Sequence, residues 1–78
     1  MSDPTFYCVQ AYNRLGERIV PARLAHYPSA DDARAAAARA AEDGVGAVAF
    51  EFTGRPEFDI WGEPRLLGRF GNVPGIAA

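Results

Sequence analysis

The first patterned stretch of the chain, Thr5–Tyr12, alternates side chains with a period of two and is rich in aromatic and β-branched residues. This alternation is typical of a β-strand with two different faces. We therefore expect a strand here. One face would carry Tyr7, Val9 and Ala11, and the other Phe6, Cys8, Gln10 and Tyr12.

A second extended stretch, Arg18–Tyr27, follows the turn-forming residues of Asn13–Glu17. Pro21 interrupts it. Because proline has no N–H to donate to a neighbouring strand, it is confined to edge strands and bulges. We therefore expect the second strand to lie at an edge of the sheet.

The segment from Ser29 to Gly44 has the pattern of one helix. Ser29 is placed to cap the first turn, with Asp32 returning to its backbone N–H, and Gly44 is expected to end the helix in a left-handed conformation. At 3.6 residues per turn, the apolar positions form one stripe made only of methyl groups, which permits unusually close packing. This alanine stripe consists of Ala33, Ala36, Ala37, Ala40 and Ala41.

The segment Val45–Thr53 alternates again and predicts a third strand. Its large side chains, Val48, Phe50 and Phe52, share one face, and we expect these to pack against the alanine stripe. The Gly- and Pro-rich segment Gly54–Pro64 then predicts a long hairpin connection. It leads to a weaker fourth strand at Arg65–Phe70.

The order β-β-α-β-β predicts one small α+β domain over residues 1–78, with a mostly antiparallel sheet of three or four strands and one helix on one face. Residues 1–4 and 71–78 are expected to be flexible or loosely docked. One helix covers only one side of such a sheet. The residues that point away from it, either Phe6, Cys8 and Tyr12 or their opposite-face neighbours, are therefore interface candidates, the alternative being an ordinary solvent-facing sheet.

Composition narrows the functional classes. Eight basic residues, all arginine, and ten acidic residues give a net charge of −2, so no bulk positive field attracts nucleic acid or anionic lipid. The longest weakly polar stretch, Val45–Phe52, is far below the roughly 20 residues of a membrane span. Cys8 is the only cysteine, and the first residues lack a signal-peptide pattern, so we expect a cytoplasmic protein without an internal disulfide.

The inventory of reactive side chains is thin. His26 is the only histidine, and no serine or cysteine stands at a spacing that forms a recognisable triad or dyad with it. Cys8 lies within a predicted strand, where a small buried hydrophobic residue is its usual role. One Cys and one His also exclude an ordinary structural zinc site. We therefore expect no catalytic residues, no metal and no cofactor.

Three carboxylates, Glu57, Asp59 and Glu63, lie close together in the predicted hairpin connection. Such a group could bind a hard cation, but it lacks the pattern of a calcium loop. Arg55 and Arg65 flank it. Ion pairing between these arginines and the carboxylates is therefore the favoured interpretation.

The same connection carries three large apolar residues, Phe58, Ile60 and Trp61. Two interpretations stay open. The residues form either a docking patch or a small core that closes one end of the sheet. Together with Phe6 and Tyr12, they are the candidate interaction surface.

Several short motifs resemble those of a loose set of small bacterial proteins of unknown function. The shared features are a VQ-bearing first strand, an S-x-D-x-A-R-x-A-A-like helix, a GxVAF strand, a PE…EP loop and a final G-x-VP. In this chain they are Val9-Gln10, Ser29–Ala41, Gly46–Phe50, Pro56–Pro64 and Gly71–Pro74. The resemblance implies a free-standing bacterial domain and transfers no activity and no site residue.

These observations favour a non-enzymatic module that forms a homodimer or binds a partner protein through the uncovered sheet face or the Phe58–Trp61 segment. The alternative is a binder of a small ligand or single-stranded nucleic acid that uses sheet aromatics with arginine support. Net acidity makes nucleic acid the weaker of these partners.

Overall fold

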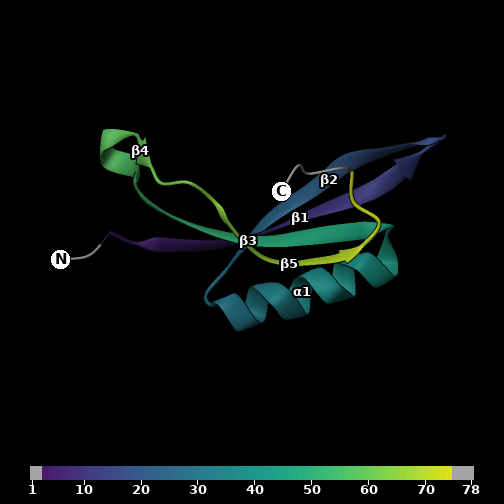
Figure 1. Ribbon diagram of the computed structural model, residues 1–78, viewed down its shortest axis with the longest axis horizontal. Coiled ribbons are helices and arrows are strands. Elements are labelled where there is room, and N and C mark those ends of the chain that lie inside the picture. Colours follow the sequence, from purple (N-terminus) through teal and green to yellow (C-terminus); the bar gives the residue numbers. More distant parts are fainter. Residues whose placement is uncertain (1–2, 75–78) are drawn as a thin grey trace.

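The computed structural model describes residues 3–74; residues 1–2 and 75–78, parts of the expected loose tails, lie outside the described residues. The described residues form five strands, one α-helix and one 3₁₀ turn (Figure 1). In chain order these are β1 (Thr5–Leu15), β2 (Arg18–Tyr27), α1 (Ala30–Asp43), β3 (Gly46–Arg55), η1 (Pro56–Phe58), β4 (Ile60–Trp61) and β5 (Arg65–Gly71).

The strands form one antiparallel sheet in which β1 lies between β2 and β3. On the other side of β3, β5 pairs with its first half and β4 with its end. The predicted α+β class is therefore confirmed. The segment Gly54–Pro64, expected to be only a connection, contains the end of β3, η1 and β4, so the sheet has five strands and not three or four.

β2 is an edge strand, as Pro21 predicted. The β1–β2 hairpin closes with Leu15 opposite Arg18, and Gly16 supplies the positive φ of 63° that the two-residue turn needs. Hydrogen-bonded and non-hydrogen-bonded residue pairs alternate along an antiparallel ladder, and counting from this turn makes Pro21 and Tyr12 a non-hydrogen-bonded pair. The N–H that proline lacks would therefore not have bonded to β1. Between Pro21 and Leu24, two residues of β2 oppose one of β1, which is a β-bulge.

The helix begins as expected and ends differently. The hydroxyl oxygen of Ser29 accepts a hydrogen bond of 3.1 Å from the backbone N–H of Asp32. Gly44, however, has φ −116° and ψ −138°, so the expected left-handed stop is wrong. Glycine is required for a different reason, because a Cβ atom there would lie 2.8 Å from both Asn13 Oδ1 and the carbonyl oxygen of Tyr12.

The core is built from the smallest apolar side chains. Three residues of the alanine stripe, Ala33, Ala36 and Ala37, are buried, and Ala40 packs beside them. Opposite them lie Val9 on β1 and two further alanines on β3, Ala47 and Ala49. The packing is therefore mostly methyl on methyl, with larger side chains only at its margin. These marginal side chains are Tyr7, Tyr27, Leu67 and Phe70.

The expected packing of Val48, Phe50 and Phe52 against the alanine stripe is wrong. Val9 lies directly opposite Ala49, and residues in direct register share a face of the sheet. The helix therefore packs on the face of Ala47 and Ala49, and the large side chains of β3 point to the other face. Small side chains on both layers let the helix lie close to the sheet, whereas rings between the layers would hold it away.

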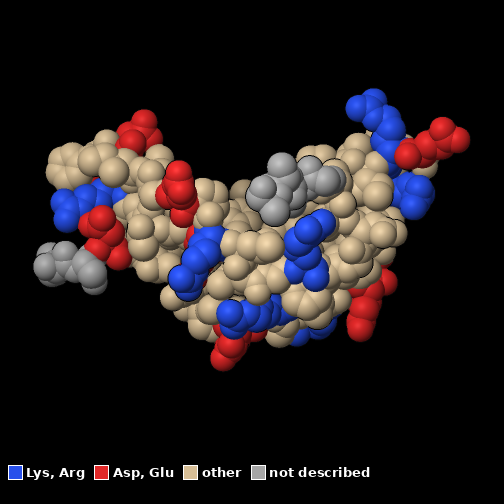
Figure 2. Space-filling model, viewed as in Figure 1, with Lys and Arg blue, Asp and Glu red and all other residues tan. Residues whose placement is uncertain are grey.

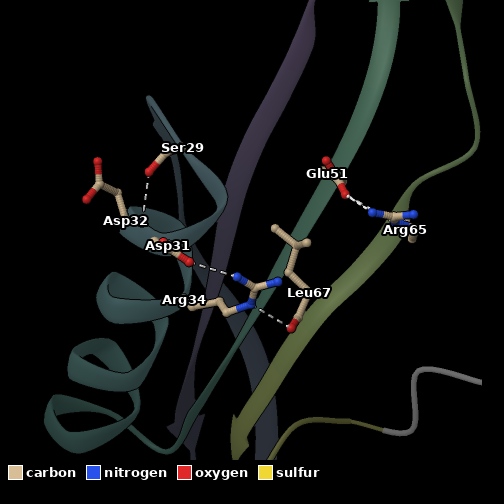
Figure 3. Close-up of polar contacts among 7 residues, drawn as sticks. All are labelled: Ser29, Asp31, Asp32, Arg34, Glu51, Arg65 and Leu67. Carbon is tan, nitrogen blue, oxygen red and sulfur yellow. Dashed lines mark hydrogen bonds and ion pairs between the residues drawn. The ribbon is translucent and has the colours of Figure 1, made fainter.

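A side chain from α1 closes the second edge of the sheet. Arg34 donates a hydrogen bond of 3.3 Å from Nε to the carbonyl oxygen of Leu67 and forms an ion pair with Asp31 at 3.1 Å (Figure 3). Leu67 lies where the register between β3 and β5 shifts. An acceptor on the outer strand is thus occupied from within the chain.

Replacing Ala37 with leucine should destabilise the protein by about 1–3 kcal/mol, because there is no space for three more carbons between the layers. Urea denaturation followed by circular dichroism measures this change. Ala35→Leu is the matched control, since Ala35 is an exposed position of the same helix and should change the free energy of unfolding little. Equal effects of the two substitutions would contradict the close packing of α1 on the sheet.

Candidate functional site

The face of the sheet opposite α1, here called the open face, is largely apolar. The strand register assigns its residues, because side chains directly opposite each other share a face. Phe6 lies opposite Phe52, Cys8 opposite Phe50, and Phe50 opposite Leu66. The remaining register positions on this face include Gln10, Val48, Leu24, His26 and Arg69.

Four aromatic rings gather at one end of the open face, and we call them the aromatic wing: Phe6, Phe50, Phe52 and Trp61. Phe6 and Phe52 are stacked with centroids 5.5 Å apart. Trp61 meets Phe52 edge-on at 5.5 Å and Phe6 at 5.9 Å, and Phe50 stacks on Phe52 at 6.2 Å. These separations are within the range of favourable aromatic pairs.

Within residues 3–74, no helix lies behind the wing. On the opposite side of these strands lie Thr5, Thr53 and the ion pair between Glu51 and Arg65, whose Oε1 and Nη2 atoms are 2.7 Å apart (Figure 3). With Glu63 and Phe52 they line an open pocket of about 320 Å³. In Figure 1, η1 and β4 form an arm that projects beyond the end of α1. This half of the sheet is therefore a single layer, aromatic on one side and polar on the other.

The position of Trp61 depends on specific neighbours. A Cβ atom on Gly54 would lie 2.5 Å from Cε3 of the indole, so the ring covers a site that only glycine leaves free. The indole N–H donates a hydrogen bond of 3.0 Å to Oδ1 of Asp59, which has the left-handed φ of 54°. With its polar atom satisfied inside the arm and 49% of its surface exposed, Trp61 presents its apolar ring to the outside.

The structure unites two of the five predicted interface residues, Phe6 and Trp61. Tyr12 lies far along β1, opposite Gly46, outside the wing. Phe58 and Ile60 are exposed on the arm, but Ile60 pairs with Arg55 and so points to the side opposite Trp61. Sequence reasoning recognised the shared face of Phe50 and Phe52 but assigned it to the helix side, and it did not single out Leu24 or Leu66.

The far end of the open face is covered by the chain itself. A Cβ atom on Gly46 would lie 2.0 Å from the carbonyl oxygen of Asn72, so the backbone after β5 passes directly over this glycine. The N–H of Asn72 donates to the carbonyl oxygen of Val45, and Gly71 has the positive φ of 69° that makes the turn. Of the described residues on this face, Leu24, Leu66 and Trp61 remain the exposed large apolar ones.

Cys8 and His26 lie on the same face of the sheet, but no hydrogen bond joins them within residues 3–74. Cys8 is 1% exposed, and burial raises the pKa of its thiol above the ordinary value. His26 lies opposite it in the register and is exposed. Within residues 3–74, no group of three or more Cys, His, Asp or Glu side chains is placed to hold a metal ion.

The predicted ion pairing of the loop carboxylates with their flanking arginines is wrong. Arg55 pairs with Asp3, and Arg65 pairs with Glu51. Arg65 lies directly opposite Glu51 in the β3–β5 register, and β3 continues to Arg55, which reaches Asp3 before the start of β1. Asp59 instead accepts the hydrogen bond of Trp61.

Comparison with known proteins found no matching family model, no similar curated protein and no similar solved structure. Within the described part of the chain, no helix is long and apolar enough to span a membrane. Function is therefore inferred from the chemistry of the surface.

Gly54→Ala should move the indole of Trp61, because the new methyl group would overlap the ring. We expect a red-shifted Trp61 fluorescence maximum and weaker aromatic circular dichroism, since the ring would lose its contacts with Phe6 and Phe52. Gly16→Ala is the comparison variant. A methyl group there meets no neighbouring atom and adds only backbone strain, so the fluorescence of Trp61 should stay unchanged. Unchanged fluorescence in Gly54→Ala would contradict the position assigned to Trp61.

Alkylation of Cys8 should be slow in the folded protein. An unfolded thiol titrates near pH 8.5, whereas burial raises the folded pKa, so at about pH 8 the folded chain holds less thiolate. Iodoacetamide labelling followed by mass spectrometry should be much faster in urea than in buffer. The same shift means that the contribution of Cys8 to the free energy of unfolding is fully present below the pKa of the unfolded thiol and is lost as the pH rises through the folded pKa. Equal labelling rates in urea and buffer would show that the thiol is accessible.

Proposed function

We propose that this protein is a non-enzymatic interaction module that self-associates through its open face. The observation that carries the proposal is the aromatic wing. Among the described residues, a single layer of strands carries four rings on one side with no second layer over them, which leaves apolar surface exposed. Contact with a second copy would remove that surface from solvent at roughly 25 cal/mol for each Å² buried.

The edges of the sheet support contact through the face. On β2, Pro21 and the adjacent bulge interrupt the outer hydrogen-bonding row. On β5, a register shift and the hydrogen bond from Arg34 to Leu67 do the same. Such features are the means by which proteins prevent strand-to-strand association. A partner therefore has more to gain from the open face than from either edge.

Size and charge support a second copy as the occupant. The two longer extents of the molecule, 45 and 22 Å, limit the footprint of one face to about 1,000 Å², against about 800 Å² per partner in a standard interface. Figure 2 shows charged side chains of both signs at the two raised ends and further basic and acidic groups across the middle and lower part of the molecule. The register places two charged residues of the paired strands on this face, Arg69 on β5 and Arg14 near the β1–β2 turn, and both lie away from the wing. Two such faces can meet without needing complementary charge.

Arginine support for nucleic acid is weak at the wing. Arg65 pairs with Glu51 on the polar side of the strands, and Arg69 lies opposite Val48, away from Phe6 and Trp61. Stacked bases would therefore gain aromatic contact with little phosphate neutralisation. Self-association is accordingly the better supported function.

Leu66→Glu should shift the protein from dimer to monomer. Leu66 is exposed beside Phe50, so glutamate would place a charge in the dimer contact while costing the monomer little stability. Sedimentation velocity over a range from low to high micromolar concentration measures the change. Trp61→Ala should weaken the dimer as well, because it removes the most exposed ring of the wing.

Leu15→Glu is the matched control. Leu15 is also exposed, but it lies at the β1–β2 turn on the helix side of the sheet, so this variant should remain dimeric. A parent protein that stays monomeric at high micromolar concentration would refute the proposal, as would equal effects of the two glutamates. Salt-dependent quenching of Trp61 by oligothymidine, without self-association, would favour the nucleic-acid alternative instead.

A further inference from the structure

A second surface lies on the helix side of the sheet, between α1 and β2. It is a groove with a cavity volume of about 290 Å³. Val9, Ala11 and Ala25 form its floor, and Ala36 and Ala40 form the wall on the helix. Because nearly all of these side chains end in one methyl group, none of them fills the space.

The groove exists because the helix is off-centre. α1 packs over β1, β3 and β5, and its contact with β2 is slight. In Figure 1, α1 follows β5 and β3, whereas β2 lies toward the far side of the sheet. The helix-facing side of β2 is therefore left partly open along Arg23, Ala25 and Tyr27.

The rim of the groove is positively charged on both sides. Arg23 stands on the β2 side and Arg39 on the α1 side. The ion pairs among residues 3–74 involve Arg34, Arg55 and Arg65, so neither rim guanidinium is neutralised by a carboxylate of the described chain. Asp43 lies at the groove as well, one helical turn beyond Arg39.

We propose that this groove binds a small organic acid with an apolar body and one carboxylate. The methyl-lined floor takes the apolar body, and the two arginines on opposite sides hold the carboxylate, which guanidinium groups match in geometry and charge. A volume of about 290 Å³ lies near the lower limit for small-molecule sites, so the ligand is small.

Asp43 weakens binding of the head group. It lines the groove one helical turn beyond Arg39, so it repels a carboxylate held by the two arginines, whose positive charge has to outweigh this repulsion. The same repulsion excludes ligands with acidic groups at both ends. This prediction is independent of self-association, because the groove and the open face lie on opposite sides of the sheet.

The test uses straight-chain carboxylates from butanoate to decanoate as probes, with primary alcohols and amines of equal length as controls. Binding to the isotopically labelled full chain is followed by amide chemical shifts. We expect shifts at Ala25, Tyr27, Ala36 and Ala40. Affinity should rise about two- to fourfold with each buried methylene until the groove is full, and acids should bind more tightly than alcohols or amines.

Three variants separate this site from non-specific binding. Arg23→Gln and Arg39→Gln should each weaken binding of the acids by about three- to tenfold and leave the alcohols unchanged. Asp43→Asn should strengthen binding of the acids severalfold, because it removes the opposing charge. Arg18→Gln, an exposed arginine at the β1–β2 turn, is the matched control and should have no effect.

The proposal is overturned if the acids bind no better than the alcohols, or if replacing Arg23 and Arg39 together leaves their affinity unchanged. Shifts confined to Phe6, Phe52 and Trp61 would also overturn it, because they would place the probes on the aromatic wing. All of these variants change exposed residues, so each should fold and give a clear result.

Discussion

The contact between the alanines of α1 and the small residues of β1 and β3 determines the rest of the architecture. Methyl groups on both layers, such as Ala37 on the helix and Ala49 on β3, let the helix lie very close to the sheet. Strand rings are thereby kept to the margin of this layer, as Tyr7, Tyr27 and Phe70 are, and the rings of the aromatic wing lie on the opposite face. The core between α1 and the sheet is small. It leaves the helix-facing side of β2 partly uncovered, and it ends before the strands reach the aromatic wing. Both candidate surfaces are thus consequences of one choice of small side chains.

Most of the secondary structure could be predicted from local patterns, because capping, turn and alternation signals act over a few residues. Ser29 and Pro21 each behaved as their chemistry predicts. The direction in which β3 faces could not be predicted from alternation alone, since a period of two is satisfied by either side. Glu51 and Thr53 lie on the same face of β3 as Ala49, so this face is small near the helix and polar beyond it. The expectation that large rings pack against the alanines placed the opposite face of β3 toward the helix.

The candidate surface was only partly predictable for a related reason. Phe6 and Trp61 are 55 positions apart in the sequence, and their contact depends on the β3–β4 pairing and on the space above Gly54. The sequence carries no signal for the β3–β4 pairing or for the space above Gly54. A two-residue strand after a 3₁₀ turn is too short to show a period of two. The groove between α1 and β2 was equally invisible, since it results from the offset of the helix and not from any motif.

The single-layered construction of the wing has a consequence for how stability is distributed along the molecule. Near Val9 and Ala49, opening the ladder would expose the buried layer beneath the helix and is therefore as costly as global unfolding. Near Phe6 and Phe52, the same hydrogen bonds are backed by polar side chains and solvent, so the strands can separate locally while the helix stays docked. One continuous β-ladder thus contains two regions of unequal opening free energy, and amide hydrogens of the same strand exchange by two different routes.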